Sequence, residues 1–198
     1  YKRQIFTGGA LTNIAAAIER GGEGFVAQRF VAQGGFAGDN VVPPECRLPK
    51  FEGQTHVPTI NFNQNQGSAH TTLSHAGFGS IWLVSKNVCH SDSNGFRADH
   101  LRRLLGILKA RGCAVPREGA LPKMRHKNSS SSARHNTGLS LIMVGMREYL
   151  SRRGQKLLHD PLAAATHVDG GVISKWREVR LGTQSSTGRG INRWGSTP

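Results

Sequence analysis

The sequence predicts an α/β fold in which helices flank a mostly parallel sheet. Two observations predict it: short apolar runs alternate with helical patterns over the first ninety residues, and a pair of glycines follows several of these runs. The 198 residues are enough to bury a core. We expect one domain, 1–198, with a basic, serine-rich insertion at 112–138 and a basic, glycine- and serine-rich tail at 177–198.

Four buried strands are predicted in the first half of the chain, each from a short apolar run. Glycine pairs follow the first two, Gln4–Thr7 and Arg29–Gln33, as expected where a strand turns toward a helix. Alternating apolar and amide side chains predict the third strand at residues 59–63, and the apolar run at residues 81–85 predicts the fourth.

Four helices are predicted from apolar spacing and from end signals. Apolar residues three and four apart predict a helix from Thr12, and leucines on one face of residues 97–111 predict the clearest helix. A helix at residues 139–150 is followed by two arginines, which suit the negative helix end. Asp160 is a good N-cap and Pro161 is favoured at the first helical position, so a fourth helix should begin there.

The charge balance favours a polyanionic partner. Twenty-six Lys and Arg outnumber twelve Asp and Glu, and the net charge of +14 exceeds what solubility requires. Structural RNA is the partner that this balance favours. Segments 112–138 and 177–198 combine arginine with glycine and serine, which suits segments that become ordered on RNA by neutralising phosphates. Solvated surface charge is the other interpretation of these residues.

Cysteine usage and apolar runs argue against several other classes. Cys46, Cys89 and Cys113 are odd in number and widely spaced, which argues against a disulfide framework and a zinc site. We therefore expect no disulfide partner and a reducing compartment. No apolar run approaches the ~20 residues needed to span a bilayer, so we expect no membrane insertion.

Five segments, in order along the chain, resemble the motifs of one enzyme family. They are residues 7–15 (TGGALTNIA), 31–43 (VAQGGFAGDNVVP), 58–63 (PTINFN), 84–90 (VSKNVCH) and 158–163 (LHDPLA). The family is the inosine-uridine preferring nucleoside hydrolases. The resemblance implies a truncated, Rossmann-like form of that family's mostly parallel sheet, in which the serine-rich segment is an insertion.

The resemblance also implies roles for individual residues. The family cleaves the N-glycosidic bond of ribonucleosides with the help of Ca²⁺. The resemblance implies that His159 would protonate the leaving base and that Thr12 and Asp160 would bind the metal. The residues that would contact the substrate are Asn40, Asn61 and Asn63. The histidine could equally be a hydrogen-bonded structural residue, the aspartate a helix cap, and the asparagines turn residues.

One departure from the family decides our interpretation. The N-terminal D-x-D-x-x-x-D-D cluster, which in the family supplies most calcium oxygens and the general base, is missing from this sequence. Ca²⁺ takes six to eight oxygens, and a site with one carboxylate and neutral oxygens binds it weakly. We therefore expect no cofactor and no catalysis. The sheet would also lack its first strand, which leaves an edge for another chain or RNA to cover.

These observations lead to three functional hypotheses. In the first, the chain is a non-catalytic scaffold of a large ribonucleoprotein, namely a mitochondrial ribosome, and binds rRNA and neighbouring proteins. Its RNA-binding residues would be Arg117, Lys123, Arg125, Lys127, Arg134, Arg152, Arg153, Arg177, Arg180, Arg189 and Arg193. In the second, it is a Ca²⁺-dependent nucleoside N-ribohydrolase whose N-terminal part lies outside this sequence. The third is an accessory subunit of a mitochondrial membrane complex. We expect a mitochondrial location, or otherwise a cytoplasmic one.

Overall fold

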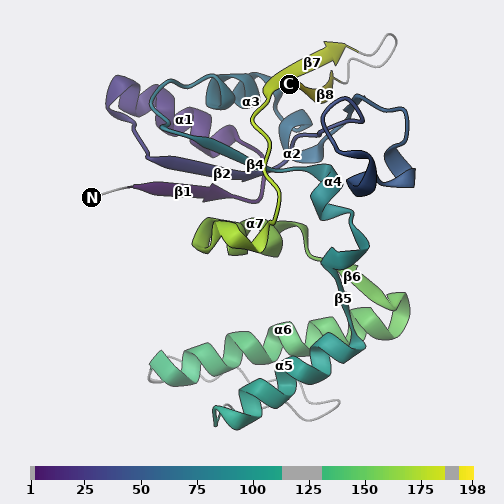
Figure 1. The fold of residues 1–198 in the computed structure, drawn as a ribbon. Coiled ribbons are helices and arrows are strands. Elements are labelled where there is room, and N and C mark those ends of the chain that lie inside the picture. Colours follow the sequence, from purple (N-terminus) through teal and green to yellow (C-terminus); the bar gives the residue numbers. More distant parts are fainter. Residues whose placement is uncertain (1–2, 113–130, 186–191) are drawn as a thin grey trace. The chain divides into compact units, whose positions relative to one another are not determined.

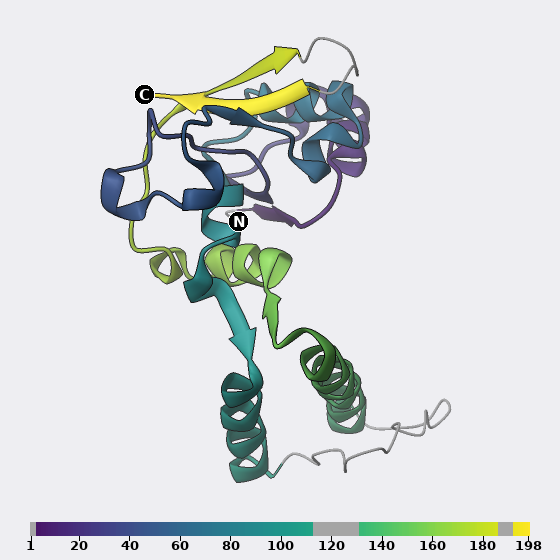
Figure 2. The same ribbon diagram turned by 90° about the vertical axis from the view of Figure 1, so that its right-hand side faces the viewer.

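The computed structural model describes residues 3–112, 131–185 and 192–198 (Figure 1, Figure 2). The chain divides into two compact units. The first, called the sheet unit, contains Tyr1–Asn94 and Leu158–Pro198, and the second, called the helical unit, contains Gly95–Leu157. None of the described helices combines the length and the apolar character that crossing a membrane requires.

Three parallel strands form the main sheet of the sheet unit. They are β1 (Gln4–Thr7), β2 (Arg29–Gln33) and β4 (Ile81–Val84), and their order is β1-β2-β4. In the register of this sheet Ile5 lies opposite Phe30, and Val31 lies opposite Trp82. The predicted α/β fold and three of the four predicted strands are therefore confirmed.

Helices cover both faces of this sheet, as Figure 1 shows. On one face lie α1 (Thr12–Gly21) and α3 (Gln66–Leu73), and on the other lies α7 (His159–Val168). Successive side chains of a strand point to opposite faces. Phe30 and Ala32 of β2 accordingly pack in the cluster that contains Leu11 of the α1 side, whereas Val31 packs with Ala163 of α7.

The remaining helical elements of the sheet unit are short. They are the helices α2 (Ile60–Asn63) and α4 (Lys86–Cys89) and the single 3-10 turns η1 (Gly22–Gly24), η2 (Pro44–Cys46), η3 (Pro49–Phe51), η4 (Asp92–Asn94) and η5 (Gly170–Val172). The helix α4 directly follows β4, so its residues lie at the carboxyl end of the parallel sheet.

The end of the chain builds a second, antiparallel sheet. Its strands are β3 (His56–Val57), β8 (Asn192–Thr197) and β7 (Arg180–Ser185), in that order. Trp194 of β8 is only 2% exposed and meets the ring of Phe62 edge-on, with centroids 5.0 Å apart. Two parts of the predicted basic tail at 177–198 are therefore the paired strands β7 and β8. Burial of the large indole ties this segment to the core.

The helical unit consists of two helices and a pair of strands. α5 (Ala98–Ala110) and α6 (Ser131–Arg153) lie side by side, and β5 (Gly95–Arg97) pairs antiparallel with β6 (Gln155–Leu157). Leu101 of α5 and Met143 and Leu150 of α6 form the buried core between the helices. The helix predicted at residues 97–111 is confirmed.

The third predicted strand is wrong, because residues 60–63 form the helix α2. The amides of Asn63 and Gln64 donate to the carbonyls four residues before them, which is a helical pattern. The alternation of apolar and amide residues suggested two faces of a strand. In the structure Phe62 is buried but Ile60 is 75% exposed, so the two apolar residues do not share a buried face.

Two predicted helix starts are also corrected. α6 begins at Ser131 and not at residue 139, so residues 131–138 of the predicted insertion are helical. No proline lies within 131–153, so the helix can continue without a break through Gly138. α7 begins at His159 with Leu158 as its N-cap. Asp160 therefore lies in the first turn, where the positive end of the helix dipole stabilises its carboxylate.

Candidate functional site

The carboxyl ends of the three parallel strands bring together several residues that the sequence singled out. The side-chain nitrogen of Asn61 lies 3.0 Å from the carbonyl oxygen of Gly8, 2.9 Å from that of Gln33 and 2.6 Å from Oε1 of Gln33. Gly8 in turn packs against α7, because a Cβ at Gly8 would lie only 3.0 Å from Cβ of Asp160. Asn61 and Asp160 therefore contact the same β1–α1 loop. Ligands of open α/β sheets bind at this edge.

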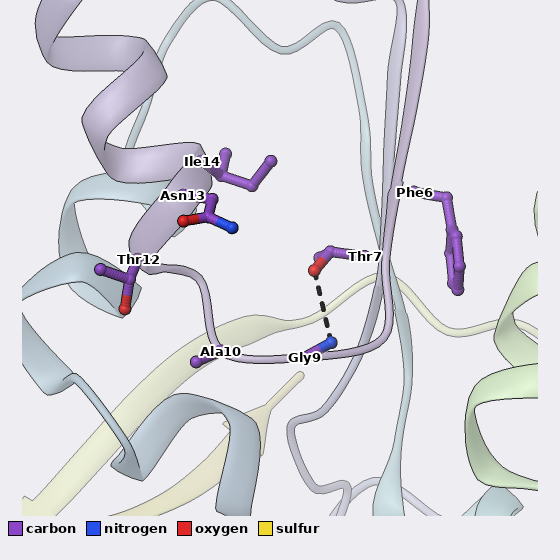
Figure 3. A pocket seen from close by; sticks show the side chains of 7 residues that line it. All are labelled: Phe6, Thr7, Gly9, Ala10, Thr12, Asn13 and Ile14. Atoms are coloured by element: carbon purple, nitrogen blue, oxygen red, sulfur yellow. Dashed lines mark hydrogen bonds between the residues drawn. The ribbon is translucent and has the colours of Figure 1, made fainter.

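Thr12 is the first residue of α1 after that loop, and the surface there is hollowed. The hollow has a volume of about 490 Å³ and is lined by Phe6, Thr7, Gly9, Ala10, Thr12, Asn13 and Ile14 (Figure 3). The amide of Gly9 donates to Oγ1 of Thr7 over 3.5 Å, and Figure 3 shows the Phe6 ring on the opposite side of the strand from Thr7. Side chains of small and apolar residues dominate this hollow.

The amides of Asn40 and Asn63 hold the C-terminal hairpin in place. Nδ2 of Asn40 donates to the carbonyl of Ser196 over 2.6 Å, and Nδ2 of Asn63 donates to the carbonyl of Asn192 over 2.9 Å. Oδ1 of Asn63 accepts from Nε1 of Trp194 over 2.7 Å. Both side chains are therefore hydrogen bonded within the chain, and they could bind ribose hydroxyls only if these hydrogen bonds were broken.

His159 lies at the start of α7 beside a second histidine. Its ring centroid is 5.0 Å from that of His90, the residue after α4. Nδ1 of His90 is 3.3 Å from the ammonium of Lys50. Partial burial, together with the positive charges of Lys50, His159 and Lys86, lowers the pKa of His90 to about 4. His90 is therefore neutral at physiological pH.

The described residues do not fit a calcium site of the predicted composition. Within residues 3–112, 131–185 and 192–198, no three or more His, Cys, Asp or Glu side chains form a group that could hold a metal ion. Thr12 and Asp160 supply one carboxylate between them, whereas Ca²⁺ takes six to eight oxygens.

Sequence reasoning missed two side chains that organise this edge. Gln33 links Asn61 to Cys89, because its Nε2 donates to Sγ of Cys89 over 3.5 Å. Asn87 accepts from the amide of Ala37 over 3.0 Å and so ties α4 to the loop after β2. Gln33 ends a predicted strand just before a glycine pair, which is the position where functional side chains gather, so this signal was present in the sequence.

Cys89 is completely buried in this network. Burial raises the pKa of its thiol to about 11, opposed by the hydrogen bond from Gln33 and increased by the negative charge of Asp160. Cys46 is exposed, and both are free cysteines. The thiolate is the reactive form of cysteine.

We therefore expect Cys89 to resist alkylation in the folded protein. With a pKa of about 11, only about 0.1% of the thiol is ionised at pH 8, and the side chain is shielded from the reagent. Peptide mapping after brief iodoacetamide treatment at pH 8 should find Cys46 labelled and Cys89 unlabelled. In denaturant the two should react alike, and equal labelling of the folded chain would contradict this prediction.

The basic residues are distributed unevenly between the two units. The helical unit holds 14 of the 26 Lys and Arg but only 3 of the 12 Asp and Glu, so it carries +11 of the net charge of +14. On α5 and directly after it, four cations are exposed, namely Arg102, Arg103, Lys109 and Arg111. The acidic residues of the sheet unit nearly balance its cations.

The predicted RNA-binding residues fall into three groups. Arg134, Arg152 and Arg153 belong to α6, where Arg152 pairs with Glu148 over 2.6 Å. Arg177, Arg180 and Arg193 are exposed residues of the sheet unit. The others lie outside the described residues: Arg117, Lys123, Arg125, Lys127 and Arg189. Cys113 lies outside them as well.

The sequence was compared with protein-family models and with curated protein sequences. No protein-family model matches the chain, and no curated protein sequence matches it. The resemblance to the nucleoside hydrolases therefore stays a prediction that depends on the five segments and on their order.

Proposed function

We propose that this chain is a non-catalytic RNA-binding protein of a large ribonucleoprotein and that its helical unit contacts the phosphate backbone. The observation that carries the proposal is the concentration of charge: Gly95–Leu157 holds +11 of the net +14. A net charge of +11 on one small unit produces a positive electrostatic potential that attracts polyanions such as RNA.

The packing of the helical unit leaves its cations available. Leu101, Met143 and Leu150 are buried between α5 and α6, and this contact holds the two helices together. Arg102, Arg103 and Lys109 lie off this face and are exposed. Arginine and lysine side chains on a helix surface reach phosphate oxygens without a preformed pocket.

The geometry of the strand ends supports the absence of catalysis. The amides of Asn40 and Asn63 are hydrogen bonded to β8, and Asn61 is hydrogen bonded to Gly8 and Gln33. The one carboxylate that the resemblance assigns to the metal, Asp160, belongs to no metal-binding group among the described residues. On this proposal, the chain uses a nucleoside-hydrolase-like fold as a scaffold.

The proposed setting is a mitochondrial ribosome. A scaffold of this kind would contact rRNA through its basic unit and neighbouring proteins through the rest of its surface. The support for this setting is the charge balance together with the resemblance to an enzyme family that here lacks its acidic cluster.

The salt dependence of RNA binding tests the proposal. Binding of the full chain to a structured RNA should weaken steeply between 50 and 200 mM KCl, because each neutralised phosphate releases about 0.7 to 0.9 counterions. With about six phosphate contacts, the affinity should fall by about a thousandfold over this range. Fluorescence anisotropy of a labelled RNA hairpin measures it.

Two controls make this experiment decisive. His159→Ala should leave the RNA affinity unchanged, because His159 lies outside the helical unit. Binding that is absent, or that does not respond to salt, would refute the proposal. Release of free base from uridine or inosine by the full chain would favour the hydrolase hypothesis instead.

A further inference from the structure

Three basic side chains of the sheet unit converge beside the carboxyl end of β4. Lys50 belongs to η3, Lys86 begins α4, and His90 follows α4. The ammonium of Lys50 lies 3.3 Å from Nδ1 of His90, and the ring of His159 lies against His90. We call Lys50, Lys86 and His90 the Lys–His cluster.

The two lysines of the cluster have no acidic partner within the described part of the chain. None of the ion pairs among those residues includes Lys50 or Lys86. Lys86 donates to the carbonyl of Pro58 over 3.0 Å, and Lys50 shares a hydrogen bond with a histidine. Two positive charges therefore lie close together without a carboxylate between them, an arrangement that costs folding free energy.

The proton positions of the cluster follow from these contacts. An ammonium has only donors, so Nδ1 of His90 must accept from Lys50 and carry no proton. In a neutral ring the proton is then on Nε2, which is a donor. Burial and the positive charges of Lys50, His159 and Lys86 lower the pKa of His90 to about 4, in agreement with a neutral ring. The cluster thus offers two cations and one neutral N–H donor.

The position of the cluster is the one where α/β sheets bind ligands. β1, β2 and β4 are parallel, and Lys86 and His90 come directly after β4 ends at Val84. Ligands of such sheets bind outside the carboxyl ends of the strands. Phe51 packs on His90, with ring centroids 5.7 Å apart, and so fixes the orientation of the imidazole.

We propose that the Lys–His cluster is a binding site for a phosphate group. A phosphate supplies the negative charge that the two lysines lack and accepts a hydrogen bond from Nε2 of His90. The site belongs to the sheet unit, whereas the proposed function assigns the phosphate contacts of RNA to the helical unit, so it goes beyond the proposed function and can fail or hold independently of it. The phosphate could come from a small phosphate monoester or from a polynucleotide backbone.

Inorganic phosphate tests the site directly. Adding sodium phosphate to the full chain at constant ionic strength and pH 7.5 should raise its unfolding temperature above that in sodium chloride. It should also shift the ring ¹⁵N resonance of Nε2 of His90 in a saturable way. Lys50→Met and Lys86→Met should each weaken phosphate binding about tenfold or more. Lys175→Met, which removes a charge of the same unit outside the cluster, should not.

Further ligands distinguish the two sources of the phosphate. Ribose 5-phosphate that binds more tightly than inorganic phosphate identifies a monoester site. An oligonucleotide without terminal phosphates that displaces inorganic phosphate identifies a backbone contact. If neither the unfolding temperature nor the His90 resonance responds to phosphate, or if Lys175→Met weakens binding as much as Lys50→Met, the proposal is wrong.

Discussion

Replacing Trp194 by Ala should lower the free energy of unfolding of the sheet unit by about 3 to 5 kcal/mol. The indole is 2% exposed and lies between Phe62 and His70, with ring centroids 5.0 and 5.1 Å away. The substitution leaves a cavity in the main core and removes the donor that satisfies Oδ1 of Asn63. Urea unfolding followed by circular dichroism measures the loss.

The neighbouring residue supplies a control for this prediction. Arg193 precedes Trp194 in β8 but is exposed, so Arg193→Ala should change the stability by no more than about 0.5 kcal/mol. Trp194→Phe, which keeps a ring in the core, should lose less than Trp194→Ala. If the Arg193 and Trp194 variants were equally stable, the hairpin would not belong to the core.

Replacing four cations of the helical unit by Gln should reduce the RNA affinity by about a hundredfold at 50 mM salt. The residues are Arg102, Arg103, Lys109 and Arg111, all exposed on α5 or directly after it. The slope of log K against log salt should become shallower by about 3, because each lost phosphate contact removes 0.7 to 0.9 of slope. Anisotropy titrations at several salt concentrations measure both quantities.

A second variant with the same net charge distinguishes a local contact of the helical unit with RNA from a general attraction of RNA to the positively charged chain. Arg20, Arg177, Arg180 and Arg193 are exposed cations of the sheet unit, and replacing all four by Gln changes the net charge by the same amount. We expect this variant to keep most of the RNA affinity. Equal losses in the two variants would show that RNA responds to net charge alone, and a larger loss in the sheet-unit variant would assign binding to the C-terminal arginines.

Local patterns in the sequence predicted the three strands of the main sheet and the helix α5. The strands Gln4–Thr7 and Arg29–Gln33 have the predicted bounds, and β4 and α5 differ from their predicted bounds by one residue at one or both ends. These elements have a clear apolar run or a clear leucine stripe, and local periodicity is sufficient for them. The helix α2 was misread because its four residues are too few to show a period.

The candidate site could be predicted only in part. The resemblance implied that Asn61 and Asp160 belong to one relic site, and both lie near the β1–α1 loop. The partners of Asn40 and Asn63 could not be predicted, because their hydrogen bonds go to residues 156 and 129 positions away. The Lys–His cluster could not be predicted either: Lys86 and His90 belong to the segment 84–90, but Lys50 lies 40 positions before His90 and belongs to none of the five segments.

The sequence by itself determined the fold class and the excess of positive charge, because both follow from composition and from patterns among neighbouring residues. The unit that holds most of this charge, Gly95–Leu157, was identified only in the folded chain. Only the tertiary structure decided which side chains are buried or hydrogen bonded within the chain. The end of the chain forms the hairpin β7–β8, because a hairpin buries the side chain of Trp194 in the core, whereas a solvent-exposed strand would leave it in water. Hydrogen bonds and buried rings join distant residues, and such pairings exist only once the chain has folded.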